Sequence, residues 1–347
     1  MKKTFVWMMI VLLAFTAVAC KPQQAAPAPA TTAVAEETAM PQETASATEA
    51  TQAPAEKEEK SEPLQIAALK GPTGMGLAYL MQDQTDAYQV ELYDAPDAVT
   101  GKFISGEIDI AAVPVNLASV LYQKTKQNAV ILAVNTLGVL YVVENGDTIQ
   151  SMADLSGKTI YATGEGSTPE YVLRYLLEKN GVNDATITFV GEHAALAAML
   201  ASGEAAIGML PEPNVSAVLL KNEQARVALN LSDEFEKVSG SQLVQGCYIA
   251  NREFVEQHLE AVQKFLEDCA ASVEQVNSNP EAAALIAQLG ILPAEGIAKK
   301  AIPNCNIVCV TGEDMTKLVL PMLQVLFDAN PASVGSSMPE QNIFFLP

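Results

Sequence analysis

The sequence is short of positive charge. Its 347 residues hold 20 lysines and arginines against 41 aspartates and glutamates, which gives a formal net charge of −21 at pH 7. Nucleic-acid-binding proteins display a basic patch, so this balance argues against that class and against adsorption to anionic lipid headgroups. The arginines are only Arg174, Arg226 and Arg252. A cluster of arginines that clamps a phosphate or a dicarboxylate is therefore not expected.

Histidine and cysteine are also scarce. The two histidines, His193 and His258, stand in helical patterns without cysteines or carboxylates at ligand spacing. This argues against a metal site and against acid–base catalysis. The cysteines after Cys20 are few and widely spaced, unlike a disulfide framework: Cys247, Cys269, Cys305 and Cys309. We predict buried free thiols, and one disulfide in an oxidising compartment is the alternative.

Motifs for a nucleotide cofactor or a catalytic serine are missing as well. Gly71, Gly74 and Gly76 lack the spacing of a dinucleotide-binding turn, and no Lys-Ser or Lys-Thr pair follows them as in a phosphate-binding loop. The residues around Ser167 do not form a Gly-x-Ser-x-Gly elbow. We therefore expect no cofactor, no catalytic residues and a protein that is not an enzyme.

The first residues carry a secretion signal. Met1-Lys2-Lys3 is cationic, residues 4–16 are mainly apolar, and small residues from Ala17 lead to Cys20. We predict a signal peptide over residues 1–19, because the apolar run is short for a membrane-spanning helix. The cysteine after the cleavage site resembles a bacterial lipobox, which implies lipidation of Cys20. Ordinary secretion is the alternative, since Ala17-x-Ala19 also fits the general cleavage site.

A low-complexity segment follows the signal. Residues 21–63 consist almost entirely of Ala, Pro, Thr, Glu, Gln and Ser and contain no aromatic residue. Such a composition buries too little apolar surface to offset the entropy of ordering. We predict that residues 20–63 are a lipidated cysteine and a disordered tether, so that the protein lies in the cell envelope, on the extracytoplasmic side of the membrane.

From residue 64 onward, strand patterns alternate with helical patterns. This rhythm predicts α/β units with mostly parallel sheets flanked by helices. Predicted strands cover residues 64–69, 88–93, 108–113, 129–134, 137–143, 158–163, 187–190, 205–210, 227–231 and 242–250. Predicted helices cover residues 75–81, 96–104, 117–123, 168–177, 193–201, 215–221, 252–277, 280–289 and 313–326, with a further helix start at Ser151. The rhythm restarts near Asn135. We therefore expect one lobe from residues 64–137 plus 245–347 and a second lobe from residues 138–244.

Several short motifs in this order resemble a known family. Gly71-Pro72-Thr73-Gly74 follows the first strand, and Gly106-Glu107-Ile108-Asp109-Ile110-Ala111 comes next. The later motifs are residues 154–160 (DLSGKTI), residues 164–169 (GEGSTP), Pro211-Glu212-Pro213 and Met338-Pro339. The chain resembles type-2 periplasmic substrate-binding proteins of ABC importers, in their sulfonate, nitrate and thiamine-precursor group. The resemblance implies a two-lobed fold with a ligand cleft between the lobes.

The expected cleft has one wall on each lobe. Ligands of open α/β sheets bind beyond the carboxyl ends of the strands, where helix N-termini offer free N–H groups. The predicted ligand-binding residues are Thr73, Gly74, Met75 and Asn116 on one wall and Gly166, Ser167, Thr168 and Glu212 on the other. Each has a structural alternative: a plain turn before Met75, a capping box between Ser167 and Glu170, and a helix-start carboxylate at Glu212.

The function expected from these features is delivery of a small organic molecule to an ABC permease. The protein would act as a monomer, held at the membrane through its lipid, with no nucleic-acid partner. One alternative is an enzyme of cofactor biosynthesis on the same fold, which the secretion signal opposes. Another is a sensor lipoprotein without a transport role. The ligand stays open between a mono-anion and a neutral heterocycle.

Overall fold

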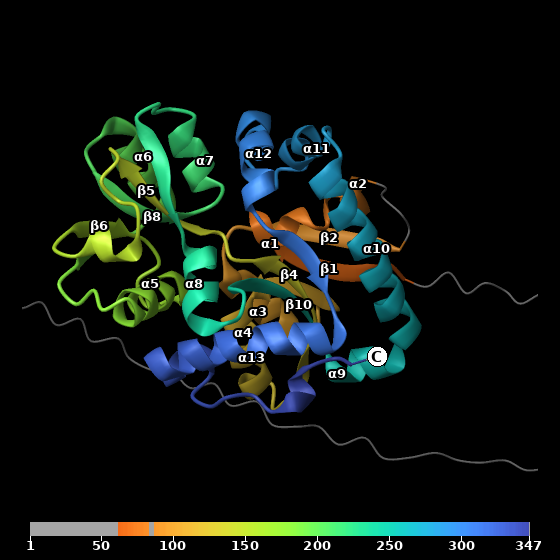
Figure 1. Ribbon diagram of the computed structural model, residues 1–347. Coiled ribbons are helices and arrows are strands. Elements are labelled where there is room, and N and C mark those ends of the chain that lie inside the picture. Colours follow the sequence, from red (N-terminus) through yellow and green to blue (C-terminus); the bar gives the residue numbers. More distant parts are fainter. Residues whose placement is uncertain (1–61, 83–86, 347) are drawn as a thin grey trace, which may run out of the picture. The chain divides into compact units, whose positions relative to one another are not determined.

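The computed structural model of the protein describes residues 62–82 and 87–346 (Figure 1). The predicted signal peptide, Cys20 and nearly all of the predicted tether lie outside these residues. The described chain from residue 62 onward belongs to one compact unit, Glu59–Pro347. It is built on two separate β-sheets.

The first sheet has the strand order β11-β4-β10-β3-β1-β2. Its strands are β1 (Leu64–Leu69), β2 (Tyr88–Tyr93), β3 (Ile110–Pro114), β4 (Ala129–Leu137), β10 (Val244–Asn251) and β11 (Ile307–Val310). β1 pairs in parallel with β2 and β3, whereas β10 runs antiparallel to both of its neighbours. β4 is buried along nearly its whole length, which explains its uninterrupted apolar sequence.

The second sheet has the strand order β7-β6-β8-β5-β9. Its strands are β5 (Leu140–Asn145), β6 (Thr159–Ala162), β7 (Thr186–Phe189), β8 (Ile207–Pro211) and β9 (Ala225–Asn230). β6 pairs in parallel with β7 and β8, and β5 runs antiparallel to β8 and β9. Both sheets are therefore mixed, a departure from the mostly parallel sheets that the sequence predicts. β5, the first strand of the second sheet, and β10, with which the chain re-enters the first sheet, each run antiparallel to both of their neighbours.

Two connections join the sheets. The first is the short step from β4 to β5 at Gly138 and Val139, and the second runs from β9 through α8 (Leu231–Ser239) to β10. Leu137 at the end of β4 pairs with Val244 at the start of β10. The chain thus leaves the first sheet and re-enters it at adjacent positions.

Helices flank both sheets (Figure 1). Those before and within the second-sheet segment are α1 (Pro72–Met75), α2 (Ala78–Gln82), α3 (Pro96–Ser105), α4 (Val115–Lys124), α5 (Thr168–Lys179), α6 (His193–Ser202) and α7 (Asn214–Leu219). After β10 come α9 (Arg252–Gln257), α10 (Leu259–Ser278), α11 (Ala282–Gln288), α12 (Glu295–Ala301) and α13 (Gly312–Ala329). Short 3-10 turns cover Met152–Leu155, Ile302–Asn304, Pro331–Val334 and Gln341–Ile343. The predicted helix start at Ser151 is confirmed, because Ser151 and Asp154 form a capping box.

The sequence did not predict α8, α12 or β11. α8 carried signals that the sequence analysis overlooked: Leu231, Phe235 and Val238 stand at helical spacing, and Asn230 and Gly240 cap the two ends. α12 is seven residues long and contains Gly296. β11 is a four-residue edge strand with irregular register. The predicted helix over residues 252–277 is divided at His258 into α9 and α10.

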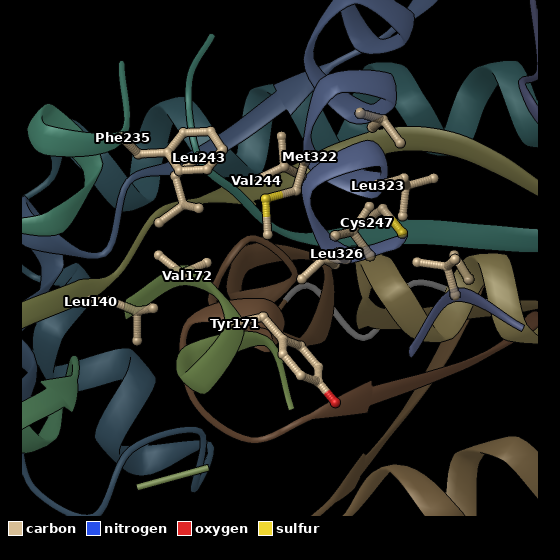
Figure 2. Packing of buried hydrophobic residues seen from close by; sticks show 14 of the residues in the cluster. Leu140, Tyr171, Val172, Phe235, Leu243, Val244, Cys247, Met322, Leu323 and Leu326 are labelled. Atoms are coloured by element: carbon tan, nitrogen blue, oxygen red, sulfur yellow. The ribbon is translucent and has the colours of Figure 1, made fainter. Parts of the chain in front are cut away.

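One apolar cluster extends across both sheets (Figure 2). Tyr171 and Val172 of α5 lie in this cluster with Met322 and Leu326 of α13, and α5 and α13 are in contact. Leu140 from the second sheet and Cys247 from the first belong to the same cluster. The two sheets are thus joined by packed side chains as well as by the chain itself.

Candidate functional site

The first candidate wall lies at the carboxyl ends of β1 and β3 in the first sheet. β1 and β3 both end there, at Leu69 and Pro114, and the antiparallel pairing places Gly246 opposite Pro114 and Thr136. Carboxyl ends of parallel strands and the turns that follow them form the usual ligand-binding edge of an α/β sheet. The predicted wall residues from Thr73 to Met75 and Asn116 follow these strand ends.

The turn after β1 is tightly built. Gly71 has φ +97°, a conformation that favours glycine, and a Cβ on Gly74 would lie 2.6 Å from the carbonyl oxygen of Leu69. The side chain of Met75 is fully buried in the core. Met75 can therefore offer a ligand only its backbone, whereas Thr73 is partly exposed.

Asn135, near the end of β4, forms a hydrogen bond to this turn. Its side chain is 1% exposed, its Nδ2 donates to the carbonyl oxygen of Thr73 at 3.4 Å, and its Oδ1 accepts from Thr136 Oγ1 at 2.9 Å. A Cβ on Gly246 would lie 2.6 Å from that Oδ1. Asn135 thus fixes the backbone of the first wall. The sequence analysis treated this position only as a break in the rhythm, because a polar residue at the end of an apolar strand also fits a loop.

Asn116 is bound to a neighbouring turn. Its Nδ2 donates to the carbonyl oxygen of Ser333 at 3.3 Å, and Ser119 on the same helix donates to the carbonyl oxygen of Val334 at 2.7 Å. These bonds hold α4 against the Pro331–Val334 turn. One Nδ2 proton and the amide oxygen of Asn116 are left for a ligand.

The second wall follows β6. Gly164 and Gly166 have φ +79° and +71°, and the loop then enters α5 at Thr168, which is 5% exposed. Ser167 Oγ donates to the carbonyl oxygen of Gly164 at 2.6 Å, and Glu170 accepts from the N–H of Gly166 at 2.7 Å. The capping box between Ser167 and Glu170, the structural alternative to a ligand-binding role, does not form, because both side chains bind the glycine loop instead. They stabilise the loop in the shape that exposes Gly166.

His193, for which the sequence analysis expected no metal or catalytic role, lies beside the end of β6. It opens α6 after β7, and its Nδ1 lies 2.6 Å from Thr163 Oγ1 at the end of β6. Thr163 is fully buried, whereas the His193 side chain is largely exposed. Burial of the ring atoms that face Thr163 lowers the pKa of His193.

Glu212 lies at the end of β8 and is 3% exposed. Its carboxylate accepts from the N–H of Ser216 at 3.0 Å and from Ser216 Oγ at 3.0 Å, so it caps the first turn of α7. Burial raises the pKa of Glu212, which the bonds from Ser216 and the charge of Lys300 offset in part. Lys70 does not pair with Glu212, because its Nζ is bound to Asp94 at 2.8 Å. Glu212 therefore has a structural role that does not depend on a ligand.

Segments from the two sheets touch at three hydrogen bonds. Tyr141 Oη donates to the carbonyl oxygen of Asn304 at 2.8 Å, and Asn306 Nδ2 donates to the carbonyl oxygen of Gly138 at 2.6 Å. Asn330, after α13, donates to Tyr171 Oη at 2.8 Å. These bonds hold the sheets in one relative arrangement, and each can break without disturbing a strand.

Two surface grooves lie elsewhere on the described chain. One of about 680 Å³ runs between α5 and α13 and is lined mainly by charged side chains and Tyr171 and Tyr175. The other, of about 630 Å³, lies at the amino ends of β1 and β2 beside His258. None of the predicted ligand-binding residues lines either groove. The assignment of the walls depends on the strand ends.

The described residues were searched for metal-binding groups and for membrane-spanning helices. Residues 62–82 and 87–346 hold no group of three or more His, Cys, Asp or Glu side chains placed to bind a metal ion. Of the helices in this part of the chain, none combines the length and hydropathy that a bilayer crossing requires.

Comparisons with known proteins agree with this architecture. Residues 129–283, somewhat less than half of the chain, match the family model described as NMT1/THI5 like. No curated protein matches the sequence.

Solved structures cover most of the chain. An ABC transporter protein from Parabacteroides distasonis superposes with a TM-score of 0.72 at 21% identity, over 82% of this chain and 99% of that one. The periplasmic aliphatic sulphonate-binding protein SsuA from Escherichia coli gives 0.66 at 22% identity, over 83% and 93%. The ligand-binding component of an ABC-type import system from Staphylococcus aureus gives 0.62 at 14% identity, over 83% and 97%. These likenesses confirm the predicted fold class, that of type-2 periplasmic binding proteins.

Proposed function

We propose that this protein is an extracytoplasmic solute-binding protein that delivers a small organic ligand to an ABC permease. The proposal starts from the fold that it shares with ligand-binding components of importers and from the match of residues 129–283 to the NMT1/THI5-like model. The observation that carries it is the topology. The strand ends that carry the two proposed walls lie next to the connections through Gly138 and α8, so rotation about these connections would open or close the space between the walls.

The ligand would be held mainly by backbone and neutral polar groups. Thr73 and Asn116 face it from the first sheet, and Gly166, Ser167 and His193 from the second. All three arginines are engaged elsewhere: Arg174 with Glu170, Arg226 with Glu144, and Arg252 with the backbone at Gln127 and Asn342. A highly charged anion is therefore disfavoured. A mono-anion bound by several N–H groups and a neutral heterocycle both fit this set.

A ligand screen tests the proposal first. Sulfonates, nitrate, pyrimidines and amino acids would be added one at a time, and the melting temperature would be measured. A ligand present at 100 times its Kd adds about 2.7 kcal/mol to the free energy of unfolding. Small-angle scattering on the identified ligand should then show a smaller radius of gyration. A tight ligand that leaves this radius unchanged would argue against a closing receptor.

A pair of glycines provides the matched test of the wall. Gly166 and Gly181 share φ +71°, and neither would bring a new Cβ within 4 Å of another atom. Gly166→Leu and Gly181→Leu should therefore strain the backbone equally. Only Gly166→Leu should weaken ligand binding, by at least about tenfold, which corresponds to about 1.4 kcal/mol. Equal affinities of the two variants would place the ligand away from this loop.

The envelope location has its own test. We propose that residues 1–19 are removed and that Cys20 carries the lipid, with residues 21–63 as the tether. Cys20→Ala should then move the protein from the membrane fraction to the soluble fraction or stop its processing, because the acidic chain has no basic patch to hold it on anionic lipid. Membrane association that survives the substitution would contradict the anchor.

A further inference from the structure

Two cysteines from distant parts of the sequence meet in the first-sheet region. Cys269 lies on α10, fully buried, and Cys309 lies on the edge strand β11, partly exposed. α10 packs against β11. Cys309 Sγ lies 3.8 Å from the carbonyl oxygen of Leu266, one turn before Cys269 on the same helix. This geometry brings the sulfur of Cys309 to the face of α10 that carries Cys269.

The surroundings give the two sulfurs different chemistry. The nearby Cys269 thiol lowers the pKa of Cys309, whereas burial, together with the nearby Cys309 thiol, raises the pKa of Cys269. The Tyr248 hydroxyl also lies beside Cys269. Reactivity of cysteine follows thiolate character and exposure. We therefore expect an external reagent to react first with Cys309. Cys269, which is fully buried, can then react with Cys309.

We propose that Cys269 and Cys309 form a dithiol site that is converted to an intramolecular disulfide by exchange with an external disulfide, either a low-molecular-weight disulfide or an oxidised dithiol protein. The Cys309 thiolate attacks one sulfur of the external disulfide, and the other leaves as a thiolate. The sulfur of Cys269 then loses its proton and attacks Cys309, which expels the second thiolate. One external disulfide is reduced to two thiols, and the two cysteines are oxidised to one disulfide.

The bond would add a covalent link between α10 and β11, which the fold joins by packing and by a hydrogen bond from Asn277 Nδ2 to the carbonyl oxygen of Ile307 at 2.9 Å. β11 follows the segment with Asn304 and Asn306, whose contacts to Tyr141 and Gly138 join the two sheets. A disulfide to α10 would anchor the end of this segment to the first sheet. The setting of the reaction depends on the extracytoplasmic location proposed above, because disulfides persist in oxidising compartments. The chemical test below does not depend on that location or on any ligand.

The experiment uses the full folded chain with oxidised glutathione, followed by alkylation of free thiols, digestion and mass spectrometry of each cysteine. We expect loss of free thiol at both Cys269 and Cys309 and a peptide pair linked through them. Cys247 and Cys305 should stay alkylatable after unfolding, since both are buried without a thiol partner. Reduction should restore all of these thiols.

Variants separate the two steps. In Cys269→Ser, Cys309 should accumulate as a glutathione adduct, because the second sulfur is missing. In Cys309→Ser, Cys269 should stay reduced, because the attacking sulfur is missing. Cys305→Ser is the matched control, four residues from Cys309, and should still form the linked peptide. Free thiols at both positions in the oxidised wild-type protein, or a linked peptide that joins Cys305 instead, would overturn the proposal. The wild-type result holds even where a variant fails to fold.

Discussion

At the scale of single residues, Glu144 is a buried carboxylate whose charge must be compensated by its partners. Its side chain is 4% exposed and binds Arg226 at 2.8 Å, and the two residues face each other across β5 and β9. Burial alone would raise the pKa of Glu144, but hydrogen bonds from Thr148 and Ile149 and the charge of Arg226 hold it below the usual value. Glu144 is therefore a buried charge that depends on its partners.

Arg226→Met should destabilise the protein by about 2–4 kcal/mol, because it leaves the carboxylate of Glu144 buried without its cation. Arg174→Met is the control. Arg174 pairs with Glu170 one helical turn away and its side chain is 56% exposed, so its loss should cost less than about 1 kcal/mol. Urea unfolding at pH 7 measures both values. Equal costs would show that the Glu144 pair is no stronger than a surface pair.

The pKa of Glu144 is lowered in the folded protein. The stability that Glu144 contributes is therefore present above its unfolded pKa and is lost as the pH falls through the folded pKa.

Glu212 should show the opposite pH dependence. Its pKa is raised by burial, so the folded state favours the protonated form. The stability associated with this group is present below the unfolded value near 4.5 and is lost as the pH rises through the folded value. Glu212→Gln cannot ionise. Its stability relative to wild type should therefore improve between pH 4 and pH 7, as urea unfolding at the two pH values would measure. A constant difference would mean that Glu212 titrates alike in both states.

At the scale of elements, the sequence predicted the helices and strands that have a regular apolar period and clear end signals. β1 and β2 lie at their predicted bounds, and α5 and α13 differ from theirs by a few residues. Their apolar periods are regular and their ends carry Gly, Pro or Asn. β11 was missed because four residues are too few to show a period, whereas α8 was overlooked although its caps and apolar spacing are local.

The residues of the candidate site also differ in whether a local sequence pattern reveals them. Thr73, Ser167 and Glu212 could be assigned because each follows a predicted strand end. Asn135 and His193 could not, since their importance comes from partners far away in the sequence, at Thr73 and Thr163. The lobe boundaries and the ligand-binding roles stay predictions.

The connection between the sheets should tolerate no added side chain. A Cβ on Gly138 would lie 2.2 Å from Ser232 Oγ and 2.7 Å from Leu243 Cδ2. Gly138→Ala should therefore cost about 1–3 kcal/mol, because α8 has to move. Gly101→Ala is the control, since it lies inside α3 with no atom within 4 Å of its new Cβ, and it should stabilise by about 0.5–1 kcal/mol. Thermal unfolding followed by circular dichroism measures both. A neutral Gly138→Ala would show that α8 is loosely held.

At the scale of the whole folded unit, the shared apolar cluster determines how the protein unfolds. The cluster includes residues from both sheets and from α5 and α13, so neither sheet can lose its packing alone. We expect one cooperative transition in urea, with coincident curves from far-ultraviolet circular dichroism and from tyrosine fluorescence. Tyrosine is the natural probe, since the only tryptophan is Trp7. Two separated transitions would show that the sheets fold independently.

The adjacent exit and return of the chain at Leu137 and Val244 has an evolutionary consequence. A segment whose two ends meet side by side in a parent sheet adds little closure entropy when its length changes. Residues 138–243 can therefore be exchanged for the equivalent stretch of a relative while the strand pairing that receives them is kept. One wall of the proposed site would then change and the other would stay, so recombination at these two points would combine old and new ligand preferences in one step.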